Sequence, residues 1–421
     1  MNKIYDKILG LEKSQKRNTV WYSFGTICSS SASMIVLLVV TRILGQDMAG
    51  IFSLAWSAAQ LMLTIGWFSM RQYQVSDVDE KYSFYDYLYA KMMSSATMIV
   101  CALLYVTVYE YSFYQKIVTL LLCVLMITEV FADFCSGFFQ HKGKLHIGGK
   151  SYVIRNVSYV LIFTITLWLK QDLCFSIACA IVVAIGCLLL FDYPLCRRVP
   201  KKKNPFYIRK SLGLFVECMP LFIGSFITSF IMNVPKNAIN MYMDNNAQAC
   251  YNILFMPSAV INMLNMFICV PFYDKLALLW WENKKNQFIK MIVKMMTLVA
   301  AITVVVLVGG AVIGIPVLSW LYNIELKSYR VAFVILLFGG GITGIISILT
   351  YVITVWRQQK IVLYVYAVIA CAVHIIAGAL IRSLGLTGAA LVYAAAMLCT
   401  CGSFMVFVWF YVKRTDSKGG V

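Results

Sequence analysis

Three acidic residues lie inside apolar stretches of the chain, where an ionised side chain is expensive. Glu129 and Asp133 are four residues apart, so a helix would place both carboxylates on one face. Glu217 lies one helical turn before Pro220. An ionised group near the centre of a bilayer costs roughly 2.5–3.5 kcal/mol unless it faces a partner or a hydrated cavity. These acids are therefore candidates for binding a proton or another cation at a cavity wall.

The two acids of the 129–133 stretch also have a simpler interpretation. Basic residues follow them closely in the chain, and an ion pair with one of these would offset the cost of the buried charge. The nearest candidates for such a pair are Lys142, Lys144 and Arg155. An ion-binding face and an ion-paired face both remain open.

Three basic residues occupy positions suited to binding phosphate. Arg42 and Lys236 stand at the ends of two apolar runs, and Arg155 lies just inside a third. The planar guanidinium of arginine binds phosphate oxygens in pairs, which favours arginine at such sites. The alternative for Arg42 and Lys236 is that they extend to lipid headgroups at the membrane surface.

Four prolines fall in or beside two neighbouring apolar runs. Proline at membrane depth frees backbone carbonyls, which is tolerated where helices bend or line a polar cavity. Asparagines stand among these prolines, which adds hydrogen-bonding side chains to the same segment. The pattern predicts a gating element marked by Pro220, Pro235, Pro257 and Pro271.

No arrangement of residues in the sequence indicates an enzyme. A nucleophile elbow, a phosphate-binding Walker loop and a carboxylate pair with catalytic spacing are all missing. The three histidines are dispersed, and the 14 cysteines are scattered with no Cys-x-x-Cys pair. We therefore expect no catalytic residue, no metal site and no cofactor.

The composition of the chain indicates what kind of fold positions these residues. The chain of 421 residues is 61% hydrophobic and only 13% charged, about half the charge of a typical soluble domain. There is too little polar surface for a water-soluble fold of this size, so lipid must surround most of the chain. The net charge of +18 comes from short clusters between apolar runs and not from one basic face, which disfavours nucleic-acid binding.

Apolar runs of spanning length predict an all-α polytopic membrane protein with about twelve transmembrane helices. With the N-terminus placed in the cytoplasm, 29 of the 36 lysines and arginines fall on the inner side, which supports the helix number and cytoplasmic N- and C-termini. The predicted helices lie near residues 20–41, 49–70, 88–109, 114–139, 151–169, 173–193, 211–233, 247–272, 291–314, 330–355, 361–381 and 386–412.

The most basic loop divides the predicted helices into two sets of six. Residues 197–210 contain Pro200 and Pro205 among seven cations and follow the sixth predicted helix. A basic loop of this kind is attracted to the anionic inner leaflet. The sequence thus predicts an N-terminal half of residues 1–196, a cytoplasmic linker of residues 197–210 and a C-terminal half of residues 211–421.

Several stretches resemble the bacterial polysaccharide flippases of the multidrug/oligosaccharidyl-lipid/polysaccharide exporter superfamily. The resemblance extends over most of the chain, through motifs that are each loose. It is carried by Thr41-Arg42-Ile43-Leu44-Gly45 with Ala49-Gly50-Ile51-Phe52-Ser53, by Arg71-Gln72-Tyr73-Gln74-Val75-Ser76-Asp77, by Gly137-Phe138-Phe139-Gln140 with Lys150-Ser151 and Arg155, and by Glu217-Cys218-Met219-Pro220-Leu221-Phe222 with Asn233-Val234-Pro235-Lys236-Asn237-Ala238-Ile239.

The resemblance implies two six-helix bundles around a central cavity that opens alternately to either side of the bacterial cytoplasmic membrane. Its implied substrate is an undecaprenyl-diphosphate-linked oligosaccharide, carried from the inner to the outer leaflet for surface polysaccharide biosynthesis. Membrane lipids and polysaccharide assembly proteins are the implied partners. By position, Arg42 and Lys236 match the family's basic residues on the first and seventh helices. The resemblance also implies coupling to a proton or sodium gradient, and no residue identifies the ion.

Three other functions stay open at this point. A cation-coupled multidrug exporter of the same superfamily would need an acidic cavity with few cations, which the basic excess disfavours. A membrane polysaccharide polymerase or acyltransferase would need a catalytic cluster or a large outer loop, and the sequence has neither. A non-transporting scaffold in a polysaccharide assembly complex is not distinguished by the sequence.

Overall fold

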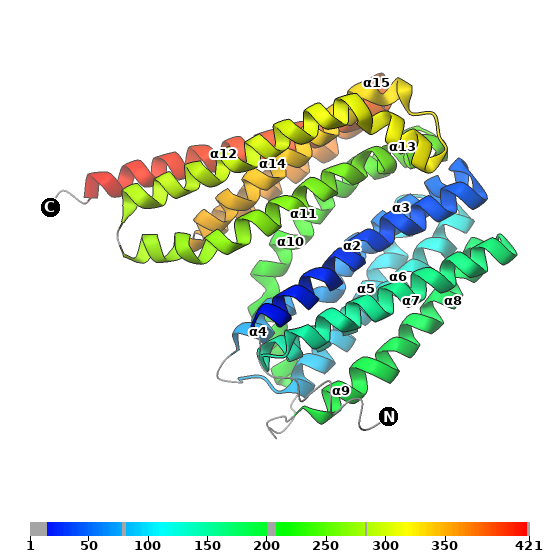
Figure 1. Ribbon diagram of the computed structural model, residues 1–421, viewed down its shortest axis with the longest axis horizontal. Helices are drawn as coiled ribbons and strands as arrows, with labels where there is room; N and C mark the ends of the chain where they lie inside the picture. Colours follow the sequence, from blue (N-terminus) through cyan, green and yellow to red (C-terminus); the bar gives the residue numbers. More distant parts are fainter. Residues whose placement is uncertain (1–14, 78–80, 200–207, 283, 357, 419–421) are drawn as a thin grey trace. The chain divides into compact units, whose positions relative to one another are not determined.

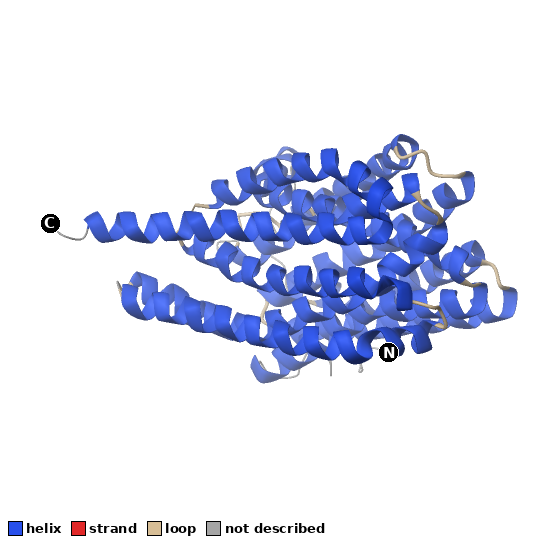
Figure 2. Cartoon of the chain, turned by 90° about the horizontal axis from the view of Figure 1, so that it is seen from above, coloured by secondary structure: helices blue, strands red, loops and turns tan. Residues whose placement is uncertain are grey.

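The computed structural model describes residues 15–77, 81–199, 208–282, 284–356 and 358–418, and this part of the chain is helical with no strand (Figure 2). The predicted all-α class is confirmed. The helices are α2 (Gln15–Leu44), α3 (Gln46–Trp67), α4 (Met70–Ser76), α5 (Phe84–Val108), α6 (Phe113–His141), α7 (Leu145–Lys170), α8 (Leu173–Cys187), α9 (Tyr193–Arg198), α10 (Ile208–Tyr242), α11 (Asn245–Trp281), α12 (Lys285–Gly309), α13 (Ile315–Tyr322), α14 (Arg330–Val355) and α15 (Gln359–Lys418). Short η segments lie at Leu188–Asp192, Gly310–Gly314 and Lys327–Tyr329.

Ten helical segments in the described part are long and apolar enough to cross a bilayer. One of them contains two rods, because α15 is broken at Gly385, which has a φ of 57°. Helix α11 is 37 residues long and adds another crossing, since only about 20 residues are needed to span the hydrocarbon. The described helices thus allow ten to twelve crossings, in agreement with the prediction of about twelve.

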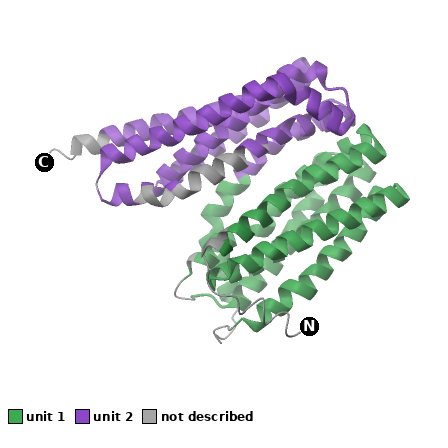
Figure 3. Cartoon of the chain, in the orientation of Figure 1, with its two compact units in different colours: residues 1–226 green, residues 227–421 purple. Residues whose placement is uncertain are grey.

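The chain folds as two compact units, residues 1–226 (unit 1) and 227–421 (unit 2) (Figure 3). The boundary between these units lies inside α10. Residues 200–207 of the basic linker lie outside the described part, and the predicted division at residues 197–210 stays a prediction. The reason for the boundary inside α10 is aromatic packing: the Phe68 ring of unit 1 stacks on Phe222 at 4.1 Å and meets Phe215 edge-on at 4.8 Å. The first half of α10 is therefore part of unit 1.

Unit 1 is built from α2 to α9 and the first half of α10 (Figure 1). Helix α3 is its most buried element and packs against α5 and α6. Helices α2 and α7 pack backbone to backbone, because a Cβ on Gly25 or on Gly149 would clash with the main chain of the other helix. Small residues that let backbones approach closely are the usual basis of helix association in membranes.

Unit 2 is organised around α14. Three consecutive glycines of α14 each face a different neighbour: Gly339 faces Tyr393 of α15, Gly340 faces the backbone of α11 at Ser258, and Gly341 faces Thr303 of α12. Successive helical residues point about 100° apart, so one run of three small residues permits three close contacts. The Ser258 hydroxyl also donates to the Leu336 carbonyl at 2.8 Å, which satisfies a buried polar group.

Candidate functional site

Buried ionisable side chains gather in unit 1. In the described ranges, no Asp, Glu, Lys, Arg or His of unit 2 is buried, whereas six such residues of unit 1 are. They form two ion-paired networks and a few separate contacts. The six residues are Asp86, Lys91, Asp133, His146, Arg155 and Asp192.

The first network begins where α3 ends. Phe68 and Ser69 both have left-handed backbone angles, with φ of 46° and 52°, and this break separates α3 from α4. A helix end leaves carbonyls without helical partners. The Lys91 ammonium of α5 donates to the Trp67 carbonyl at 2.9 Å, and the Ser94 hydroxyl donates to the Gly66 carbonyl at 2.8 Å. A buried cation thus closes the C-terminal end of a broken helix, where the helix dipole favours positive charge.

Asp133 of α6 lies between two cations in this network. Its Oδ1 accepts from Arg71 at 3.1 Å, and its Oδ2 lies 3.4 Å from the Lys91 ammonium. Arg71 also donates to Gln140 at 2.9 Å and lies 4.9 Å from the ring centre of Tyr22. The structure thus gives Asp133 ion-pair partners that lie far from it in the chain, and neither is among the neighbours considered from the sequence. This arrangement ties α4, α5 and α6 together.

The second network joins α6, α7 and the segment after α8. Arg155 is fully buried, with 0% exposure, and donates to Glu129 at 2.6 Å. Asp192 is 2% exposed and accepts from the Ser151 hydroxyl at 2.7 Å. The pairing of Arg155 with Glu129 is one of those considered from the sequence. Asp192 is not among the sequence candidates, because Pro194 signals an irregular helix nearby but does not indicate that the acid is buried.

A π-helical turn places Asp192 inside the bundle. The turn covers Leu188–Asp192 and directly precedes α9, which has Pro194 in its first turn. Proline lacks an N–H and its ring collides with the carbonyl four residues earlier, so the helix widens ahead of it. Such π turns occur frequently at functional sites. A second π turn, Gly310–Gly314, stands before Pro316 in the same way.

Glu217 lies near the beginning of α10 and fastens it to the α4–α5 connection. Its carboxylate accepts from the Lys81 ammonium at 2.5 Å, from the Tyr82 hydroxyl at 2.9 Å, and from the Tyr73 hydroxyl. Burial, reinforced by this bond to Glu217, raises the pKa of Tyr82 well above its usual value, so Tyr82 remains a donor. The side chain is about a third exposed and serves as an anchor between segments of unit 1.

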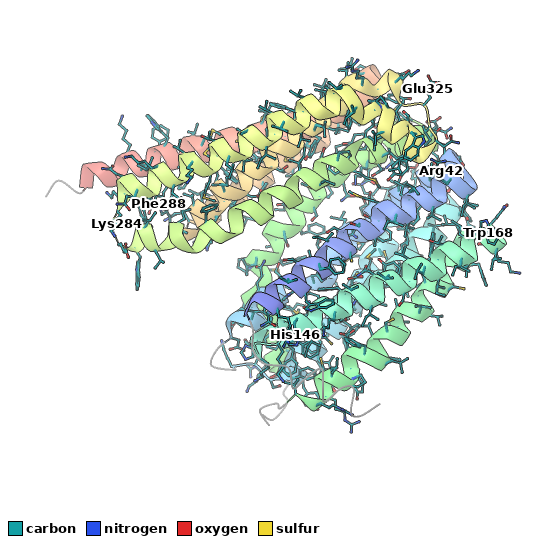
Figure 4. All side chains as sticks on the ribbon, in the orientation of Figure 1. Arg42, His146, Trp168, Lys284, Phe288 and Glu325 are labelled. Atoms are coloured by element: carbon teal, nitrogen blue, oxygen red, sulfur yellow. The ribbon has the colours of Figure 1, made fainter. Side chains whose placement is uncertain are left out.

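The predicted phosphate-binding cations are not gathered at one place within unit 1. Arg42 is exposed in the last turn of α2, at the same end of unit 1 as Trp168, whereas His146 marks the opposite end (Figure 4). Arg155 stands 13 residues before Trp168 on α7, which corresponds to about 20 Å along the helix. Arg42 is thus a surface cation, and Arg155 is an interior one.

Lys236 lies in the second half of α10, in unit 2. It is half-buried, and its ammonium stands 5.2 Å from the ring centre of Phe255 on α11. Buried amide side chains lie on this stretch of α10 and on the first turns of α11. The amides are Asn233, Asn237, Gln248 and Asn252.

The prolines do not interrupt their helices. Pro220 is exposed and Pro235 is buried within a continuous α10, and Pro257 is half-buried within a continuous α11. Pro271 also falls in α11, but its side chain lies outside the described residues. Their predicted role in gating stays a prediction. In the described part of the chain, no group of three or more His, Cys, Asp or Glu residues could hold a metal ion.

Comparisons with known proteins agree with this arrangement of helices. A family model described as "Polysaccharide biosynthesis protein" matches residues 16–272. None of the curated proteins matches the chain in sequence.

Three solved structures cover nearly the whole chain. The lipid II flippase MurJ, in an inward closed conformation, has a TM-score of 0.67 at 16% identity and covers 92% of this chain and 87% of its own. An inward-facing multidrug resistance MATE family transporter of the MOP superfamily has a TM-score of 0.66 at 12% identity, covering 93% and 96%. A MOP superfamily transporter from Pyrococcus furiosus has a TM-score of 0.58 at 12% identity, covering 96% and 95%. At these identities the likeness establishes the fold.

Proposed function

Because the chain belongs to the polysaccharide biosynthesis protein family, we propose that it is a flippase for an undecaprenyl-diphosphate-linked oligosaccharide. It carries this lipid from the inner to the outer leaflet of the bacterial cytoplasmic membrane as a step in surface polysaccharide biosynthesis. The observation that carries the proposal is the family match over residues 16–272, joined to a fold shared with the lipid II flippase MurJ.

The flippase solves a problem of desolvation. A diphosphate with several sugars cannot enter about 30 Å of hydrocarbon without losing its hydration. A hydrated, cationic passage supplies replacement contacts for the head group while the polyprenyl tail stays in lipid. Alternating access, in which the passage opens to one leaflet at a time, then moves the head group across. The central cavity that this requires stays a prediction.

We assign contact with the diphosphate to Arg42 and Lys236. Arg42 is exposed and Lys236 is half-buried, so each retains a surface that a ligand can reach. Arg155 is buried and paired with Glu129, which favours a role inside unit 1 and not on the substrate. Asp133 is likewise engaged by Arg71 and Lys91, so any acid that moderates substrate binding lies elsewhere.

The rival function is a multidrug exporter, since MATE transporters share the fold about as closely as the lipid II flippase does. The Pyrococcus furiosus structure is described as having a binding pocket of reversed polarity that suggests a different function, so pocket polarity is informative within this fold. In the described part of unit 2, Lys236 is half-buried and no carboxylate is buried. This balance suits an anionic substrate better than a cationic drug.

The orientation and the partners follow from the same proposal. We place both termini and the basic segment 197–210 in the cytoplasm, where the excess of cations belongs. Polysaccharide assembly proteins that supply and consume the lipid-linked sugar are the expected partners in the membrane. Drug susceptibility of a deletion strain separates the two functions, because only an exporter protects the cell.

The decisive experiment measures movement of a lipid-linked oligosaccharide across vesicles that contain the purified protein. Arg42→Gln and Lys236→Gln are each expected to slow this movement about tenfold or more, since a hydrogen bond to a charged group contributes about 1.5–3 kcal/mol. Lys170→Gln and Lys290→Gln are matched controls, because both cations are exposed near helix ends. Unchanged rates in both variants remove these residues from the mechanism, and no movement with the wild-type protein removes the function.

A further inference from the structure

We propose that the interior of unit 1 contains a proton-binding site formed by Glu129, Arg155 and Asp192, and that Asp192 is the group that takes up the proton. This site deepens the proposed function, on which its use in transport depends, because it supplies a place where a proton gradient can act. The site lies among α6, α7 and the π turn after α8, and it is distinct from the surface and half-buried cations assigned to the substrate.

The charge balance of the site is the first observation. Two carboxylates lie in a network with one guanidinium, which forms an ion pair with Glu129, and the Arg155 and Asp192 side chains are 0% and 2% exposed. With both acids ionised, the cluster carries one uncompensated negative charge inside a membrane-spanning bundle. An uncompensated charge at such depth is expensive, and the usual outcome is that the group becomes neutral. A single proton removes the excess.

The hydrogen bonds identify which of the two acids, Glu129 or Asp192, receives the proton. Glu129 accepts a charge-assisted bond from Arg155 at 2.6 Å, which favours its ionised form. Asp192 receives one neutral donor, the Ser151 hydroxyl at 2.7 Å, on Oδ2, while its buried Oδ1 has no hydrogen-bond partner. Two donor atoms of Arg155, Nε and Nη1, also have none. Oδ1 of Asp192 is therefore the atom that binds the proton.

The other groups around the site do not supply a compensating charge. In the first network Arg71 and Lys91 are both engaged by Asp133, so its cations are bound to that acid and not to Glu129 or Asp192. The remaining titratable neighbours are phenols and thiols on the packed elements, and none is a cationic side chain. They are Tyr152 and Tyr159 on α7, Cys135 on α6 and Cys196 on α9.

Loss of the proton changes the packing of this interface. With Asp192 neutral, Arg155 is committed to Glu129; with Asp192 ionised, Arg155 has two carboxylates to satisfy and two unused donor atoms with which to do so. The segment after α8 is then drawn toward α7. Two arrangements of one interface, selected by a proton, are what a gradient needs in order to bias a transport cycle.

Infrared difference spectroscopy of the purified full-length protein tests the site without any transport. The wild type is expected to show one protonated carboxylic acid band that disappears as the pH is raised. Asp192→Asn removes the band, whereas Glu325→Gln, a change at an exposed acid, leaves it intact. Ser151→Ala keeps the band but shifts its C=O frequency upward, because a donor to the carbonyl oxygen is lost.

Several outcomes overturn the proposal. A band that persists in Asp192→Asn, that is lost in Glu129→Gln instead, or that is absent from the wild type contradicts the assignment to Asp192. A titration that depends on sodium concentration contradicts a proton as the ligand. The Ser151→Ala frequency shift keeps the test valid if Asp192→Asn fails to fold. A protein that shows the expected bands but moves no lipid-linked sugar retains the proton site and loses the proposed function.

Discussion

The two units of this chain solve the same packing problem in different ways. Unit 1 holds its helices together through buried ion pairs, with Asp133 between Arg71 and Lys91 and with Arg155 on Glu129. Both units also use glycines for close helix contacts, Gly25 and Gly149 in unit 1 and the glycines of α14 in unit 2, but the described interior of unit 2 has no buried charge. Both devices are suited to lipid, where apolar side chains gain nothing by leaving hydrocarbon for a protein interior.

The difference in buried charge indicates that the two units have different roles. Ion pairs are costly to assemble in a bilayer and costly to break, so the networks of unit 1 fix which helix faces which. Close backbone contacts are held by many small dispersion terms and need no charged group. Unit 1 therefore carries specific geometry and titratable chemistry, while unit 2 presents neutral amides and the half-buried Lys236.

The largest loss of stability is expected from a substitution in unit 1. Asp133→Asn leaves the buried Lys91 and the half-buried Arg71 without a carboxylate, and breaking a buried pair in this way costs about 3–5 kcal/mol of unfolding free energy. Unfolding of the purified protein in denaturing detergent measures it. Adding Lys91→Met should restore part of the loss, because one uncompensated cation is then gone. A double variant whose loss equals the two single losses together contradicts the network.

A smaller loss of stability is expected from a substitution in unit 2. Gly340→Ala places a methyl group against the backbone of α11 at Ser258, and overpacking of this kind costs about 1–3 kcal/mol. Gly402→Ala is the matched control, because no atom lies within 4 Å of the added methyl group and alanine is the better helix former. The control should be neutral or slightly stabilising. Equal losses in both variants would mean that α14 and α11 do not approach closely.

The sequence predicts the helical class of the two units but not the ion pairs inside unit 1. Helix number and class follow from local properties, hydropathy and the distribution of cations, so they are predictable and the fold confirms the class. The ion pairs join residues far apart in the chain, as Arg71 and Asp133 are, and no periodicity reveals them. From the sequence, Arg71 and Lys91 are interpretable only as cations near the inner surface.

Asp192 is another residue whose burial the sequence does not reveal. It stands at the end of an apolar run and before the basic loop, a position typical of an interfacial acid. Only the π turn ahead of Pro194 directs it inward, and the depth of that turn depends on the packing of α6 and α7. Pairing of Glu129 with Arg155 was accessible from the sequence because one loop joins their helices.

A third prediction concerns the anchor of α10 in unit 1. Glu217→Gln removes the charge that holds Lys81, Tyr82 and Tyr73, yet Lys81 is more than half exposed and Glu217 about a third exposed. The expected loss of stability is about 1 kcal/mol or less, as for other solvent-screened ion pairs. The same unfolding assay measures it, with Glu282→Gln, which affects an exposed pair with Lys284, as the control. A loss as large as that of Asp133→Asn would show that the anchor is part of the buried network.

The smallest effect on stability is expected at Lys236. Lys236→Met keeps the length of the side chain and its contact with the Phe255 ring, while it removes the cost of holding a charge at a half-buried position of an uncharged interior. The unfolding free energy should change by less than about 1 kcal/mol, whereas transport of the lipid-linked sugar in the same preparation should fall. This separation distinguishes a cation kept for its ligand from one kept for the fold, since the buried cations of unit 1 cannot be removed without a structural cost. A loss of stability comparable to that of Asp133→Asn would mean that Lys236 belongs to the architecture, and the contrast between the two units would fail at that residue.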